Sequence, residues 1–181
     1  GSMCAILNVD KDIISKTCKQ IENKFNTIVA PANINSPKQI VISGTIIGVN
    51  QVVKHLTQSG YKKCIKLNVS VASHSRLMDE ISKDFRDELN EIDFNEPNCE
   101  VIHNVDNKSS SDIFDLKEKL LNQLTCPVQW INTMNYIKKF NGIVIECGPN
   151  KILTGIAKSN GIKNIFSTSS KNFIDEIKEV L

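Results

Sequence analysis

The sequence predicts an α/β protein, because short apolar segments with strand character alternate along the chain with longer amphipathic segments. In the first third the order is β-α-β-β-α-β, and after Asn68 single helices and strands alternate. A composition of 40% hydrophobic and 23% charged residues is that of an ordinary globular protein. We therefore expect a mixed α/β fold with a packed core.

The first strand and helix are defined by an apolar segment, a capping residue and a helical period. Met3 to Val9 is short and apolar, and Asp10 stands where a helix N-cap belongs. In the helix that follows, the apolar residues on one face are Ile14, Cys18, Ile21 and Phe25. This face is expected to pack on a sheet.

Three further strands and a helix complete the first third. Thr27 to Ala30 and Gln39 to Ser43 are predicted strands, and the prolines and asparagines of PANINSPK between them predict a loop rather than a tight hairpin. A helix over Val49 to Ser59 and a strand over Lys62 to Leu67 follow. The arrangement is ferredoxin-like, with four antiparallel strands and both helices on one face. We expect residues 3–67 to form one domain, although this fold alone assigns no function.

The remainder, residues 68–181, is predicted as a second domain whose sheet is incomplete. Its expected elements are a helix from Ser75 to Glu91, a strand from Glu100 to Val105, a helix after the polar loop Asn107 to Asp112, a helix starting at Pro127, a strand from Ile143 to Ile145, a helix from Lys151, a strand from Asn164 to Thr168 and a helix from Lys171 to Leu181. Few strands are present, so we expect the chain to be a piece of a larger fold.

Charge and cysteine usage exclude several classes of protein. The net charge of +2 comes from lysines scattered among acids, which argues against a nucleic-acid partner. The six cysteines form no C-x-x-C pair and the three histidines lie far from them, so neither a metal site nor a disulfide framework is expected. No apolar run is long enough to span a membrane, and no signal peptide is evident. These features predict a soluble intracellular protein without a cofactor or membrane partner.

The candidate chemistry centres on one histidine. No nucleophile elbow of the form G-x-S-x-G occurs. His74, in VSVASHSRLM, follows a strand and precedes a helix, where a ring nitrogen could act as a general base; a structural hydrogen bond is the alternative on the residues alone. His55 and His103 have no acidic or thiol neighbour in sequence and are expected to be structural or surface residues. The segment ECGPN, at the end of a strand, is either a structural turn or a binding loop.

Five segments occur in an order and spacing that carry more information than any one of them. They are PANINSPKQIVISG, VSVASHSRLM, NVD at Asn104 to Asp106, QLTCPVQW and ECGPNKILTG. Together they resemble the malonyl-CoA:acyl carrier protein transacylases, over about Met3 to Lys158. The resemblance implies an α/β-hydrolase-like acyltransferase core with a small ferredoxin-like subdomain inserted in it. Residues 3–67 would be that subdomain, and residues 68–181 the C-terminal part of the core.

The resemblance also implies a reaction and a catalytic histidine. A serine takes the malonyl group from coenzyme A as an ester and passes it to the pantetheine thiol of acyl carrier protein. His74 matches the general base, whose second ring nitrogen is held by a main-chain carbonyl at the position of Gln123. The resemblance therefore predicts that the His74 ring and the Gln123 carbonyl meet.

Polar residues of the first domain match the substrate cleft. Asn33, Asn35 and Gln39 match a polar loop where the pantetheine arm would need amide partners. The alternative that Asn33 and Asn35 only satisfy the loop backbone stays open.

The implied partners are malonyl-CoA and acyl carrier protein, in the cytoplasm or a bacterial-derived organelle. Acyl carrier proteins are acidic, so lysines bordering the cleft are candidates for docking. The candidates are Lys62, Lys63 and Lys151.

The chain also departs from the family pattern. The serine elbow, the oxyanion-hole glutamine and the arginine that pairs with the malonyl carboxylate belong to a part of the pattern before Met3, so we expect the chain alone to be inactive. The alternative is a catalytically incompetent half-protein that only binds acyl carrier protein.

Two positions within the matched segments also differ from the family pattern. Asn150 replaces a glycine, which is tolerable in a left-handed conformation, and Arg76 stands where a small residue or proline is usual. A stand-alone ferredoxin-like sensor or RNA-binding module is disfavoured, because the strands Thr27 to Ala30 and Gln39 to Ser43 carry no exposed aromatic pair for base stacking.

Overall fold

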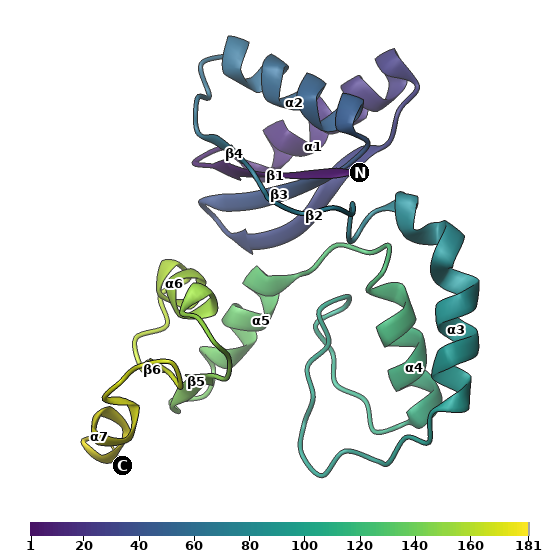
Figure 1. Ribbon diagram of the computed structural model, residues 1–181. Coiled ribbons are helices and arrows are strands. Elements are labelled where there is room, and N and C mark those ends of the chain that lie inside the picture. Colours follow the sequence, from purple (N-terminus) through teal and green to yellow (C-terminus); the bar gives the residue numbers. More distant parts are fainter. Residues whose placement is uncertain (181) are drawn as a thin grey trace. The chain divides into compact units, whose positions relative to one another are not determined.

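The computed structural model describes residues 1–180 and confirms a mixed α/β fold (Figure 1). The chain divides into two compact units, Gly1–Trp130 and a second unit that starts at Ile131. The predicted domain boundary after Leu67 stays a prediction.

The first unit begins with a four-stranded antiparallel sheet. Its elements are β1 (Ser2–Leu7), α1 (Lys11–Phe25), β2 (Val29–Ser36), β3 (Gln39–Gly44), α2 (Ile46–Gln58) and β4 (Cys64–Lys66). The strands lie in the order β2-β3-β1-β4, and each neighbouring pair is antiparallel. Figure 1 shows both helices over the same face of this sheet. The observed element order is the β-α-β-β-α-β order that the sequence predicts.

The two faces of β1 are both buried, which explains why its sequence is apolar throughout. Met3 and Ala5 cluster with Val41 of β3 on one face. Ile6 lies on the opposite face, under the helices, with neighbours from β3, α1 and α2. The side chains of this layer that are almost fully buried are Ile6, Ile14, Ile42, Val49, Val52 and Leu56. Burying each such aliphatic side chain contributes about 1.5–3 kcal/mol. This layer is the main core of the first unit.

Capping residues fix the ends of the two helices. The Asp10 carboxylate accepts a hydrogen bond from the Asp12 amide at 2.8 Å, as the sequence predicts for an N-cap. Thr45 caps α2 through the Gly48 amide at 2.9 Å. Gly60, with φ of 95°, follows α2 in a conformation that side chains rarely adopt.

The predicted loop between the second and third strands is wrong. β2 continues to Ser36, so only Pro37 and Lys38 turn the chain, and Ser36 pairs directly with Gln39. The register shifts twice along β2, which accommodates the irregular sequence. Pro31 is tolerated because β2 is the edge strand of the sheet. Val128 bonds to that edge, donating to the Ala32 carbonyl at 2.8 Å and accepting from Ile34 at 2.9 Å.

The rest of the first unit is helical, with one long loop. The predicted helix over residues 75–91 is divided into a 3-10 helix, η1 (Arg76–Ile81), and α3 (Ser82–Glu91). α4 (Ile113–Asn122) follows, with Asp112 as its N-cap. Arg86 of α3 is paired with Glu118 of α4.

The predicted strand from Glu100 to Val105 is wrong. No strand is assigned there, because this part of the chain has no partner strand among the described residues and its backbone bonds locally. The His103 amide donates to the Lys108 carbonyl at 3.1 Å. The loop is tied to α4 by Lys119, which is buried and lies 2.8 Å from Asp106 and 3.4 Å from Asp115.

The second unit contains a two-stranded parallel sheet and short helices. Its elements are β5 (Val144–Glu146), α6 (Ile152–Ser159), β6 (Ile165–Ser167) and α7 (Phe173–Lys178), after α5 (Trp130–Ile137), which begins at the last residue of the first unit. The predicted helix start at Pro127 is wrong by three residues, since Val128 is bonded to β2 and Trp130 opens the helix. The described helices include none long and apolar enough to cross a membrane.

Candidate active site

His74 lies in a turn just before η1, in the segment that connects β4 to η1. Its φ is 57°, a left-handed conformation that few residues other than glycine adopt. The next residue, Ser75, is buried, and its hydroxyl donates to the Ala72 carbonyl at 2.7 Å and accepts from the Leu77 amide at 3.3 Å. These bonds fix the backbone on both sides of His74. A strained residue held in this way is typical of functional sites.

The His74 ring meets the main chain at the end of α4. Its Nδ1 lies 2.6 Å from the Gln123 carbonyl oxygen, which is the approach that the sequence predicts. Gln123 is the C-cap of α4. The last carbonyls of a helix have no partner within the helix and carry the negative end of its dipole. This carbonyl is therefore free to accept a hydrogen bond from the His74 ring.

The same bond fixes the tautomer of the ring. A carbonyl oxygen only accepts, so Nδ1 must carry the hydrogen in this contact. In the neutral imidazole, Nε2 is then the unprotonated nitrogen. The ring thus presents a nitrogen that can take up a proton, while the opposite nitrogen holds it in place.

Gln123 is held in turn by Asn104, whose role the sequence does not predict. Its side-chain oxygen accepts a hydrogen bond from the Asn104 amide at 3.1 Å. The Asn104 carbonyl accepts from Gln129 at 2.8 Å. Asn104 is the first residue of the NVD segment. The presence of this segment in the family pattern is the feature of the sequence that points to Asn104.

An apolar cavity of about 310 Å³ adjoins the ring. It is lined by Ser73, His74, Met78, Phe85, Leu120, Gln123 and Leu124. Apolar surroundings with few polar groups are usual for ligand sites.

Comparisons with known proteins agree with these motifs. A family model described as the acyl transferase domain matches residues 2–166. The malonyl CoA-acyl carrier protein transacylase of Salmonella typhimurium is 36% identical over 160 residues, which are 87% of this chain and 51% of that protein. This chain belongs to the malonyl-CoA:acyl carrier protein transacylase family.

Solved structures of transacylases match over nearly the whole chain. The Xanthomonas oryzae transacylase has a TM-score of 0.91 at 27% identity, covering 99% of this chain and 57% of that one. A malonyl-transacylase in complex with a type II polyketide synthase acyl-carrier protein has a TM-score of 0.87 at 29% identity, covering 98% of this chain and 58% of that one. The chain therefore spans about half the length of the transacylases it matches.

The polar residues predicted for the transacylase cleft lie on strands rather than in a loop. Asn33 and Asn35 are part of β2, and Gln39 opens β3. The Asn35 side-chain amide donates to the Gln39 side-chain oxygen at 3.0 Å. Asn33 pairs with Val41 and forms an isolated bridge with Val128. The structure thus brings Asn35 and Gln39 together. The side chains of Asn33, Asn35 and Gln39 are all half-buried.

The three lysines predicted for carrier docking are exposed. Lys62 and Lys63 lie between α2 and β4 in the first unit. Lys151 immediately precedes α6 in the second unit. Their docking role stays a prediction.

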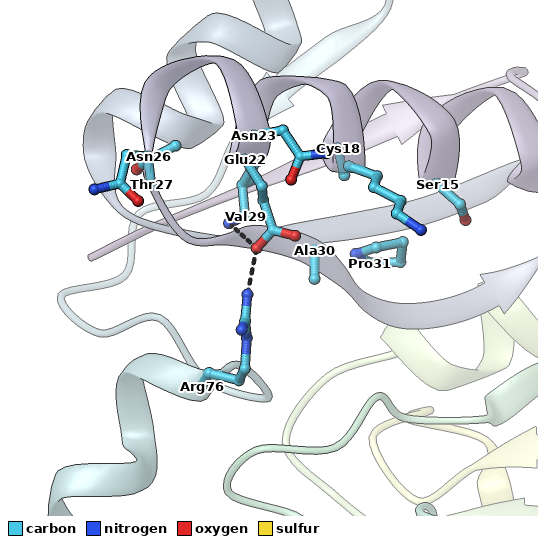
Figure 2. A pocket seen from close by; sticks show the side chains of 11 residues that line it. Ser15, Cys18, Glu22, Asn23, Asn26, Thr27, Val29, Ala30, Pro31 and Arg76 are labelled. Atoms are coloured by element: carbon cyan, nitrogen blue, oxygen red, sulfur yellow. Dashed lines mark hydrogen bonds and ion pairs between the residues drawn. The ribbon is translucent and has the colours of Figure 1, made fainter.

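The two departures from the transacylase pattern have different outcomes. Asn150 does not have a positive φ, so a left-handed conformation does not explain its presence. Its carbonyl accepts from the Ser167 hydroxyl at 3.1 Å. Arg76 forms an ion pair with Glu22 of α1 at 2.7 Å (Figure 2).

The other histidines lie elsewhere. His55 is exposed near the end of α2, and His103 is buried in the loop before α4. Burial lowers the pKa of His103, and nearby Lys119 lowers it further, against the opposing effect of Asp106 and Asp115. Within residues 1–180, no group of three or more histidine, cysteine, aspartate or glutamate side chains could hold a metal ion.

Proposed function

We propose that this chain supplies the general base and part of the substrate cleft of a malonyl-CoA:acyl carrier protein transacylase. The observation that carries the proposal is the hydrogen bond between His74 Nδ1 and the Gln123 carbonyl, which leaves Nε2 free for proton transfer. In this proposal residues 3–67 are the small ferredoxin-like subdomain and residues 68–181 are the C-terminal part of an α/β-hydrolase-like core.

The proposed reaction has two acyl transfers. A serine from a segment outside these 181 residues attacks the malonyl thioester carbonyl, and His74 Nε2 takes the hydroxyl proton as the new C–O bond forms. Collapse of the tetrahedral adduct breaks the C–S bond, and the protonated His74 returns the proton to the coenzyme A thiolate. In the second transfer His74 takes the proton of the pantetheine thiol, and the thiolate attacks the ester carbonyl to form the new C–S bond. The C–O bond to the serine then breaks, and the protonated His74 returns the proton to the serine oxygen.

In this proposal the Gln123 carbonyl has the role that a carboxylate has in many hydrolases. It orients the ring, and the negative end of the α4 dipole stabilises the imidazolium that forms during each attack. Asn104 secures Gln123 through its side chain. No cofactor is required for this chemistry.

The proposed substrates are malonyl-CoA and the pantetheine arm of acyl carrier protein. The partner is supported by a relative of this chain that was solved with an acyl-carrier protein. Asn35 and Gln39 are bonded to each other at 3.0 Å, and we expect this pair, with Asn33, to exchange that bond for the amides of the arm. Lys62, Lys63 and Lys151 would attract the acidic carrier.

The second candidate function is binding without catalysis. In this case the chain is half of a transacylase that binds acyl carrier protein but does not transfer malonyl groups. It is favoured by the coverage, since the chain spans about half of the Salmonella typhimurium transacylase. The two candidates differ in whether a complete protein depends on His74 for acyl transfer.

The proposal is tested in a full-length protein that joins this chain to a segment carrying the serine nucleophile. We predict that His74→Ala slows formation of the malonyl-enzyme ester by at least about a hundredfold, because general base catalysis typically contributes that factor. The measurement is single-turnover quench with malonyl-CoA, followed by mass spectrometry of the intact protein. His55→Ala, at an exposed histidine of α2, is the matched control. Equal rates for wild type and His74→Ala would contradict the role of His74.

A further inference from the structure

Glu22 connects three parts of the first unit through one oxygen atom. Its Oε1 accepts a hydrogen bond from the Val29 amide at 3.1 Å, at the first residue of β2. The same oxygen accepts from Arg76 Nη2 at 2.7 Å. Figure 2 shows both contacts converging on the Glu22 carboxylate below α1. The Val29 bond orients the carboxylate, so the acceptor for Arg76 is fixed by α1 and β2.

Arg76 is coupled to His74 by a short and rigid piece of backbone. It is the first residue of η1, and only Ser75 separates it from His74. Ser75 is buried and bonded at both ends of the turn, to Ala72 at 2.7 Å and to Leu77 at 3.3 Å. A displacement of Arg76 is therefore transmitted to His74 instead of being absorbed by a flexible linker.

His74 itself needs external support. Its φ of 57° is unfavourable, and such conformations persist only where the surroundings hold them. The Gln123 carbonyl holds the ring from α4. The Glu22–Arg76 ion pair attaches the loop that contains His74 to a second element, the helix α1.

The exposure of the pair argues against a stabilising role. The Arg76 side chain is 63% exposed and that of Glu22 is 22% exposed. Ion pairs this exposed contribute little to the free energy of unfolding. Catalysis is far more sensitive to geometry, since a misplacement of about 1 Å can slow a reaction about a hundredfold.

We infer that Arg76 is a positioning residue, which acts through Glu22 to hold the His74 loop against α1 with Nε2 aligned for proton transfer. This inference rests on the proposed role of His74 as the general base. It assigns a function to one of the two residues at which this chain departs from the family pattern.

The test uses the full-length protein and separates chemistry from binding. We expect Arg76→Ala and Glu22→Gln each to lower the rate constant of ester formation about tenfold, with KM for malonyl-CoA and the thermal unfolding midpoint nearly unchanged. Arg76→Lys should recover most of the rate, because only one N–H of Arg76 is used. The double variant should be no slower than either single one, because the two side chains act as one unit.

Lys83→Ala is the matched control, since it removes another exposed ion pair, Lys83–Asp87, from α3. Its rate constant should equal that of wild type. A wild-type rate for Arg76→Ala, in a protein whose ester formation depends on His74, would overturn the inference alone. A raised KM with an unchanged rate constant would also overturn it, because Arg76 would then bind substrate. Loss of dependence on His74 would instead overturn the proposed function.

Discussion

Two histidines of the first unit differ in what surrounds their rings. The His74 ring is bonded to the Gln123 carbonyl at 2.6 Å. His103 is 6% exposed, and its Nε2 is buried with no hydrogen-bond partner among residues 1–180. A positive charge on His103 would therefore be poorly solvated and would face the Lys119 ammonium.

His103 should make the stability of the protein depend on pH. Burial, then Lys119, lowers its pKa in the folded state below the ordinary value of 6.5, so the unfolded chain binds the proton more readily. The stabilisation is full above about pH 6.5 and is lost as the pH falls through the lower folded value. We expect the thermal unfolding midpoint to fall over this range in wild type, and to fall less in His103→Gln.

The control for this prediction is His55→Gln, at an exposed histidine of the same unit. Its pH profile should parallel that of wild type. Parallel profiles for wild type and His103→Gln would show that His103 has no part in the acid response.

At the residue scale, the sequence identified the contact but not the support around it. The match to VSVASHSRLM and QLTCPVQW predicted that the His74 ring meets the Gln123 carbonyl, which the structure confirms. The Asn104–Gln123 and Glu22–Arg76 contacts join residues 19 and 54 positions apart. Such contacts depend on how elements pack, which local patterns do not reveal.

A buried carboxylate connects a strand and a helix in the second unit. Glu146, the last residue of β5, accepts hydrogen bonds from the Leu153 amide at 2.9 Å and the Thr154 amide at 2.8 Å. The Thr154 hydroxyl adds a third bond at 2.5 Å. These donors lie in the first turn of α6, where a negative charge is favoured by the helix dipole.

Glu146→Gln should weaken this connection. Burial opposes ionisation of Glu146, but the bonds from Thr154 and Leu153 outweigh it and hold the pKa below the ordinary value of 4.5. The stabilisation is therefore present above about pH 4.5 and is lost as the pH falls through the folded value. At neutral pH we expect a loss of about 1 kcal/mol, as for other helix caps, measured by chemical denaturation. Glu179→Gln, at an exposed glutamate, should have no effect.

At the element scale, the errors share a physical cause. The segment PANINSPK contains turn residues, yet most of it is strand, because an edge position and two register shifts tolerate a proline. The residues from Glu100 to Val105 include valine and isoleucine, which favour strands, but they have no partner strand in the described part of the chain. Strands depend on their neighbours, whereas the helices that the sequence predicted, such as α1, follow from their own period and caps.

In the proposed function, the molecule as a whole has to attract an acidic carrier protein. Exposed lysines at positions 62, 63 and 151 are the proposed docking charges. We predict that Lys62→Glu with Lys63→Glu, and separately Lys151→Glu, raises the apparent KM for acyl carrier protein in the full-length protein and leaves that for malonyl-CoA nearly unchanged. The effect should shrink at high salt, since exposed charges are screened.

The matched control reverses the same number of charges on α1. Lys11→Glu with Lys16→Glu, both exposed, should leave both KM values near wild type. Equal effects of the Lys62 and Lys63 variant on both substrates would refute electrostatic steering.

At the scale of the whole molecule, the proposed function requires this chain to form half of an active site. The chain contains the hydrogen bond between His74 and the Gln123 carbonyl, and it spans about half the length of the related transacylases. The most direct measurement is to incubate the 181-residue chain with labelled malonyl-CoA, alone and with the missing half supplied in trans or covalently, and to analyse covalent label by mass spectrometry. We predict label only in the complemented protein, on a serine outside this chain, because removing a nucleophile typically costs several orders of magnitude in rate. A stable ester on a serine of the isolated chain, formed at a rate near that of the complete protein, would contradict the account.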